Sequence, residues 1–289
     1  MTPHTLNRIP GPALVLLAIV SIQGGSALAI ALFAIYDPLA LLALRMAFGA
    51  AVLCLAHRRA IIGAARSSPA GIVALGLTMV AQSGAFYGAI DRIPLGIAAS
   101  IELLGPLVLA LATSRRTIDI ATVLLAGAGV AVLAPDVGER LDPIGVACAA
   151  GAAAGWAAFI LIGRRLGRTL DGGVGLTLAM AVAALVLLPF VGPRALATAA
   201  GAPHTMVAVV GVALFASALP LLFEYLALKT VSPTRYGVLL SIEPVAATLV
   251  GLVALGQRVA PDAWVAVGLI SGASMLAAWF ARSQPPTSG

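Results

Sequence analysis

The chain has 289 residues, of which 61% are hydrophobic and only 10% are charged, whereas soluble domains contain roughly 25% charged residues. Its formal net charge of +6 would suit a nucleic-acid-binding protein, but the basic residues are scattered over short loops and form no patch interleaved with aromatic residues. The composition therefore excludes an ordinary water-soluble domain and indicates an integral membrane protein.

Apolar runs separated by charged or proline-rich segments predict ten membrane-spanning helices. Each run is close to the roughly 17–25 residues that a helix needs to cross the hydrocarbon layer, and none shows the alternation typical of strands. The first run is too long for the apolar region of a secretory signal, which has about 7–15 residues. The predicted spans are 12–34, 38–57, 70–90, 94–113, 118–135, 142–163, 173–192, 206–228, 235–255 and 262–280.

The basic residues predict the orientation of these spans. If the N-terminus is cytoplasmic, 12 of the 17 Lys and Arg residues fall in cytoplasmic segments, four fall in external loops and Arg45 lies inside a span. The positive-inside rule then places both termini in the cytoplasm. The four external ones are Arg92, Arg140, Arg194 and Arg258.

The ten spans divide into two sets of five around the loop at 136–142. Because five is odd, the second set must enter the membrane in the opposite sense. We therefore expect an all-α fold of two inverted five-helix repeats, 12–135 and 142–280. The tripeptide Ser-Ile-Glu occurs once in each half, at 100–102 and at 241–243, as internal duplication predicts.

Four charged side chains lie well inside the predicted spans: Arg45, Glu102, Glu224 and Glu243. Such a side chain costs roughly 2.5–3.5 kcal/mol at the centre of a membrane helix, so it normally faces a polar interior. Two of the glutamates also lie near a proline, Pro106 after Glu102 and Pro244 after Glu243. Since proline cannot donate an amide hydrogen bond to the preceding turn, we expect a kink beside each carboxylate.

These positions allow functional and structural interpretations. Glu102 and Glu243 can line a central cavity and carry a proton, or they can be protonated residues that only join helices. Glu224, near the predicted cytoplasmic end of its span, can instead extend its carboxylate to the interface. Arg45 can bind a substrate carboxylate in bidentate fashion or form a static ion pair with one of the glutamates.

Uncharged polar and aromatic residues supply further candidates for the cavity lining, although each can instead serve as a contact between helices. They are Gln23, Gln82, Tyr87, Ser100, Ser241 and Trp156. The cysteines Cys54 and Cys148 form no CxxC or Cys/His cluster, so we expect neither a metal site nor another cofactor.

These features favour a secondary transporter over two alternatives. A P-loop for ATP hydrolysis and the HExxH metal-binding pattern are both absent from the sequence, which disfavours ATP-driven transport and a membrane-embedded enzyme. An uncoupled channel would not require acidic residues at mid-membrane. An ion gradient remains as the energy source, most simply protons carried by a glutamate between two halves that move around a shared cavity.

The sequence resembles the drug/metabolite transporter superfamily with its paired EamA-type repeat, and within it the bacterial threonine/homoserine exporters. Besides Arg45 and Glu224, the resemblance is carried by residues 21–25 (SIQGG), 94–98 (PLGIA), 114–116 (SRR) and 233–235 (PTR), followed by Gly237, Ser241, Glu243 and Pro244.

This resemblance implies a ten-helix carrier in the bacterial cytoplasmic membrane that exports small amino acids or related metabolites in exchange for protons. A drug or metabolite exporter for another class of substrate is the alternative. The sequence departs from the pattern at Gln257, where the repeat usually has glutamate, at Ser83, where the exporters carry asparagine, and by one inserted residue between Lys229 and Pro233.

Overall fold

The computed structural model describes residues 9–112, 117–133, 140–170, 172–228, 231 and 233–280, and within these ranges all regular structure is helical. Each of the ten predicted segments is helical. The first half contains α2 (Gly11–Leu32), α3 (Pro38–Ala56), the short helix α4 (Ile61–Ser67), α5 (Pro69–Ile90), α6 (Leu95–Ala112) and α7 (Thr117–Leu133). Seven helical segments are long and apolar enough to cross a membrane.

The second half contains two segments that change their helical form midway. It begins with α8 (Pro143–Leu166) and α9 (Gly172–Gly201), and it ends with α14 (Pro261–Phe280). Between them, a short 3-10 turn η2 (Pro203–Thr205) leads into α10 (Met206–Ala213), the π-helical turn η3 (Leu214–Ala218) and α11 (Leu219–Leu228). The next segment consists of α12 (Pro233–Leu240) and α13 (Glu243–Leu255).

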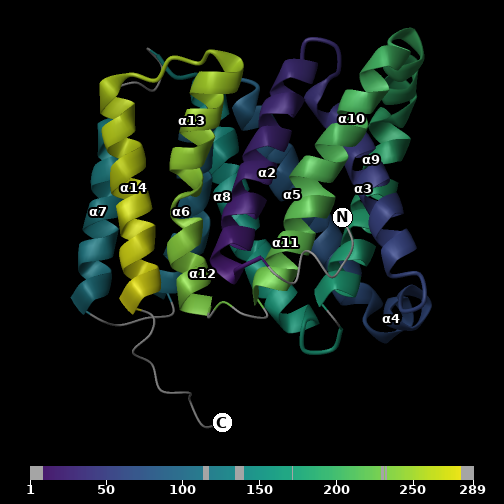
Figure 1. The fold of residues 1–289 in the computed structure, drawn as a ribbon, viewed down its shortest axis with the longest axis horizontal. Helices are drawn as coiled ribbons and strands as arrows, with labels where there is room; N and C mark the ends of the chain where they lie inside the picture. Colours follow the sequence, from purple (N-terminus) through teal and green to yellow (C-terminus); the bar gives the residue numbers. More distant parts are fainter. Residues whose placement is uncertain are drawn as a thin grey trace.

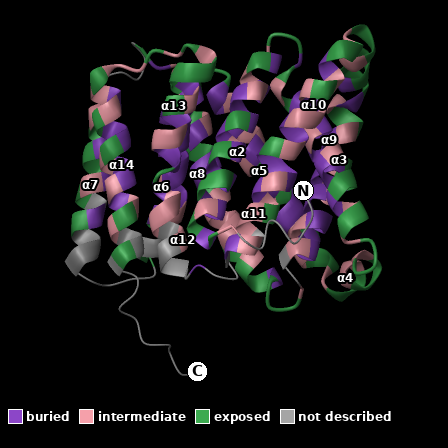
Figure 2. Ribbon diagram, in the orientation of Figure 1, coloured by how far each residue is buried: buried purple, intermediate pink, exposed green. Residues whose placement is uncertain are grey.

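The helices run side by side, and α2 begins near the edge at which α14 ends (Figure 1). In Figure 2, exposed residues follow the outer faces of the helices while buried residues face the middle. Many exposed residues are large and apolar, such as Val253 (83% exposed), Phe190 (81%) and Leu55 (74%). Such an exterior is stable only when lipid covers it.

One predicted boundary and one predicted kink need correction. The segment predicted to end at 192 continues as α9 to Gly201, through Pro189 and Pro193, so Arg194 lies in a helix and not in a loop. Prolines are tolerated inside membrane helices where the freed carbonyls find other partners. Similarly, α6 continues through Pro106 as a helix. The kink expected at Pro244 is instead a full interruption, at which α12 ends and α13 begins.

Asp142 caps the first turn of α8. Asp142 accepts a hydrogen bond from the amide of Ile144 (2.7 Å) at the start of α8, and it also pairs with Arg92 (3.0 Å). The backbone bond and the Arg92 bond together hold the pKa of Asp142 below its usual value. The stabilisation from this shift is therefore present above the ordinary pKa of an aspartate and is lost as the pH falls through the lowered one.

Glycines let particular helices approach closely. A Cβ on Gly96 in α6 would overlap Thr248 of α13, and one on Gly105 in α6 would overlap the carbonyl group of Ala153 in α8. At Gly129 a Cβ would meet Ile270, so α7 and α14 also meet through a glycine. These contacts bring α6 against both α8 and α13, which places Glu102 and Glu243 near one another in the middle of the protein.

The contact at Gly105 gives a direct test of this packing. We expect Gly105→Ala to destabilise the protein by about 1–3 kcal/mol, because the new methyl group meets backbone that cannot rotate away. Gly127→Ala in α7 is the matched control, since nothing lies within 4 Å of its Cβ position, and it should be neutral or slightly stabilising. Thermal unfolding in detergent measures both; equal melting temperatures would contradict the close contact of α6 with α8.

Candidate functional site

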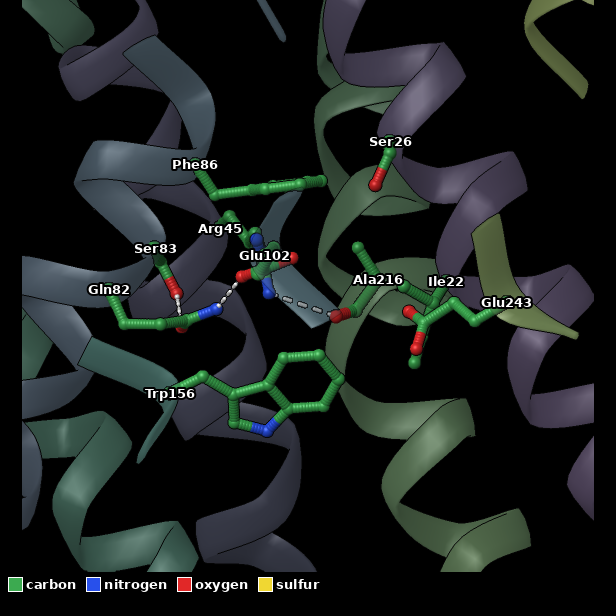
Figure 3. A pocket seen from close by; sticks show the side chains of 10 residues that line it. All are labelled: Ile22, Ser26, Arg45, Gln82, Ser83, Phe86, Glu102, Trp156, Ala216 and Glu243. Atoms are coloured by element: carbon green, nitrogen blue, oxygen red, sulfur yellow. Dashed lines mark hydrogen bonds between the residues drawn. The ribbon is translucent and has the colours of Figure 1, made fainter. Parts of the chain in front are cut away.

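A polar cavity of about 160 Å³ lies in the middle of the helix bundle. Its walls come from α2, α3, α5, α6, α8, η3 and α13, so both halves of the chain contribute. Figure 3 shows Gln82 and Ser83 on one side, Glu243 and Ile22 on the other, and the Trp156 ring across one end. The lining residues are Ile22, Ser26, Arg45, Gln82, Ser83, Phe86, Glu102, Trp156, Ala216 and Glu243.

A second cavity of about 200 Å³ shares several of these residues, among them Arg45, Gln82 and Trp156, and it extends to Glu224. All four charged residues predicted inside the spans therefore border one or the other of two cavities that share lining residues. Of these, Glu102 and Glu243 are almost fully buried, with 6% and 8% exposure. A buried carboxylate that faces a cavity is available to a small ligand or to a proton without contact with lipid.

Each of the two repeated glutamates receives a hydrogen bond from a glutamine on a neighbouring helix. Gln82 Nε2 donates to Glu102 Oε1 (2.5 Å), and Gln23 Nε2 donates to Glu243 Oε1 (3.1 Å). Ser83 in turn donates to Gln82 Oε1 (3.0 Å), which fixes the orientation of that amide. Gln23 Oε1, by contrast, is buried and has no hydrogen-bond partner.

Arg45 is hydrogen-bonded to η3, next to Pro220, which lacks an amide hydrogen. In a regular helix the amide of residue 220 would donate to the carbonyl of Ala216, but Pro220 has no amide hydrogen. The π-helical turn η3 lies at this point, and Arg45 Nη2 donates to the free Ala216 carbonyl (3.0 Å) while its Nε donates to Ser217 Oγ (2.9 Å). The adjacent carbonyl of Phe215 accepts from Ser21 (2.7 Å).

These contacts bear on the two roles that the sequence allows for Arg45. Within the part of the chain that the structure describes, Arg45 donates to a carbonyl and to a hydroxyl group, and no ion pair joins it to a glutamate. Its guanidinium also lies 5.4 Å above the ring of Tyr87. A fixed guanidinium that keeps unused donors at a cavity wall can bind a carboxylate.

Some predicted site residues lie outside the cavity lining. Ser100 is fully buried and donates to the carbonyl of Gly96 in its own helix (2.7 Å). Ser241 is also fully buried and lies at the interruption between α12 and α13. Tyr87 supports Arg45, and Gln23 contacts the cavity through Glu243.

Sequence analysis missed Ser217 and Pro220. The signal was present, because Pro220 follows Ala216 by four residues inside an apolar span, and the same spacing separates Pro106 from Glu102. Ser26 and Phe86, which line the cavity, gave no comparable signal, since neither is charged nor close to a proline.

Comparison with known proteins identifies the class to which this fold and cavity belong. The second half, residues 143–279, matches the EamA-like transporter family. Relatives that align with almost the whole chain are 34–35% identical to it. The chain therefore belongs to the EamA-type transporters of the drug/metabolite transporter superfamily.

Two relatives with the same name come from different bacteria. The chain is 35% identical over 281 residues to the threonine/homoserine exporter RhtA of Escherichia coli K12, with 94% of each chain covered. It is 34% identical over 291 residues to RhtA of Salmonella typhimurium LT2, covering 98% of this chain and 97% of the relative. A solved crystal structure with 21% identity superposes with a TM-score of 0.61 over 93% of this chain and 98% of that one, which supports the fold.

The link between Arg45 and the Ala216 carbonyl predicts a rescue. Arg45→Ala should leave that carbonyl without a donor and destabilise the protein by about 1–3 kcal/mol. Adding Pro220→Ala supplies the missing amide hydrogen and should recover part of the loss. Melting temperatures of the two single variants and the double variant in detergent measure this; strictly additive effects would contradict the proposed role of Pro220.

Proposed function

We propose that this protein is a secondary transporter that exports small amino acids such as threonine and homoserine in exchange for protons. The observation that carries the proposal is the central cavity, which presents one fixed guanidinium and two buried carboxylates between the halves of the chain. The relatives named threonine/homoserine exporters support the substrate class.

The charges of the cavity complement those of an α-amino acid. Arg45 offers donors to the substrate carboxylate, while Glu102 or Glu243 can accept the substrate ammonium group. The cavity volume of about 160 Å³ also favours small substrates, since pockets for drug-sized molecules measure roughly 300–1,000 Å³. The alternative of a drug exporter fits this volume less well.

Competition at the carboxylates explains how protons would drive export. An ionised glutamate attracts the substrate ammonium group, whereas a protonated one does not, so that substrate and proton compete within one cavity. The proton gradient then releases substrate on the acidic side of the membrane. Such an exchange involves no covalent step, which agrees with a transporter and not with an enzyme.

The packing of the helices supports two inverted repeats, 12–135 and 142–280, that change their relative position around this cavity. Corresponding helices contact each other, as a two-fold axis between halves requires: α3 with α9, α6 with α13 and α7 with α14. The contact of α5 with α8 corresponds to that of α2 with α10 and α11. Alternating access would proceed by movement along these interfaces.

The transport assay uses the purified chain in liposomes loaded with threonine. We expect exchange for external labelled threonine and homoserine, and accumulation when a pH gradient is imposed. Arg45→Lys should raise the half-saturation concentration by about tenfold or more, because lysine cannot reproduce the forked geometry. Arg92→Lys, in the turn between α5 and α6 and outside the cavity lining, is the matched control. Absence of any exchange by the unaltered chain would refute the proposal.

The proposed topology places both termini in the cytoplasm of a bacterial cell, with the protein in the cytoplasmic membrane. Reporter fusions at Gly289 and within residues 136–142 should therefore report opposite sides of that membrane, because five spans separate them. If both fusions report the same side, the ten-span topology is wrong.

A further inference from the structure

We propose that the two repeated glutamates divide the work: Glu243 carries the coupling proton with Gln23 as its positioning residue, while Glu102 stays charged and binds the substrate ammonium group. The inference rests on the proposed function and specifies what that function leaves open. It follows from the differences between the two carboxylate sites.

Glu102 lies in a network that is arranged around a negative charge. Gln82 donates to its carboxylate, and the amide of Gln82 is oriented by the bond from Ser83. Arg45 is near enough to act electrostatically on Glu102, and it is itself fixed by Ser217 and the Ala216 carbonyl. The site therefore suits a permanent charge.

Glu243 receives its hydrogen bond from a glutamine whose own oxygen has no partner. Gln23 is 1% exposed, its Nε2 donates to Glu243, and its Oε1 is unpaired. A half-turn of this amide exchanges Nε2 for Oε1, which can accept a hydrogen bond from the protonated carboxyl group. No third residue has to change. Gln23 can thus bond Glu243 in either protonation state.

The charged groups around Glu243 also differ from those around Glu102. Glu102 on α6 and Glu224 on α11 both act on Glu243 with the same sign of charge. Tyr236 on α12 interacts with Glu224, and Arg45 on α3 borders the same cavity. Helix α2 carries no charged residue, and α14 carries only Asp262, which pairs with Arg140 at the loop edge. The repulsion between Glu102 and Glu243 acts on both, but a proton on Glu243 relieves it and leaves the attraction between Arg45 and Glu102 in place.

The backbone at Glu243 offers a means for protonation to affect conformation. Glu243 is the first residue of α13, and Ser241 and Ile242 interrupt the helix before it. A carboxylate at this end of a helix is stabilised by the helix dipole, and a neutral acid is not. At the other end of α13, the side chain of Gln257 accepts a hydrogen bond from the amide of Leu95 at the start of α6 (3.1 Å). Helix α13 thus joins the proton site to the contact between the halves.

The test compares Glu243→Gln with Glu102→Gln in liposomes, with Arg92→Gln as the control. We expect Glu243→Gln to retain measurable threonine exchange and to lose accumulation driven by a pH gradient. Glu102→Gln should keep that accumulation while its half-saturation concentration for threonine rises about tenfold or more, because a charged partner of the ammonium group is lost. Exchange by each variant, with elution as a single species in size-exclusion chromatography, shows that it is folded.

Gln23 is tested through the pH profile. Gln23→Leu removes the donor to ionised Glu243, so the pH midpoint of transport should move upward by about one unit. Gln82→Leu should instead raise the half-saturation concentration and leave the midpoint in place. Gln23→Asn, which keeps the amide, should restore part of the original profile. A purely structural role of Gln23 would lower the transport rate without moving the midpoint.

The outcomes separate this inference from the function on which it rests. If the unaltered chain exchanges threonine without responding to a pH gradient, proton coupling itself is wrong. If the unaltered chain is coupled but Glu102→Gln abolishes accumulation and Glu243→Gln does not, the assignment is reversed. Loss of accumulation in both variants would contradict a division of labour, and its retention in both would show that neither glutamate carries the proton.

Discussion

A backbone carbonyl inside a membrane must find a donor, because no water is present in the hydrocarbon layer to supply one. The site of this protein depends on how that requirement is met beside its prolines. Pro220 removes the helical partner of the Ala216 carbonyl, and Arg45 replaces it. The same bond that satisfies the backbone holds the guanidinium at the cavity wall. Arg45 therefore combines a structural contact with a position at the cavity wall.

Pro244 shows a different solution to the same constraint. It lies in the first turn of α13, where its missing amide hydrogen has no helical partner to lose. The helix is interrupted immediately before it, and Glu243 therefore begins a new helix. In the first half, α6 runs on through Pro106. Two similar sequences thus place their glutamates in different backbone settings, one in mid-helix and one at a helix start.

Sequence patterns predicted the broad arrangement because the lipid environment makes hydrophobicity and length decisive. They predicted helical segments that the described residues bear out, and Arg45, Glu102, Glu224 and Glu243 do border two cavities that share lining residues. Sequence patterns could not predict which side chains form hydrogen bonds between helices. The bonds from Gln23 to Glu243 and from Gln82 to Glu102 depend on tertiary contacts between helices that are distant in the sequence. The continuation of α9 through Pro189 and Pro193 was likewise decided by packing and not by local propensity.

The neutral side chain at position 257 has a consequence for where the protein responds to acid. Gln257 joins the end of α13 to the first amide of α6. An amide has no proton to gain over the physiological range, so its acceptor oxygen is the same at every pH. The contact between Gln257 and Leu95 is therefore constant over this range, whereas the cavity carboxylates can take up protons. Protonation of the cavity carboxylates therefore leaves the hydrogen bond between Gln257 and the Leu95 amide unchanged.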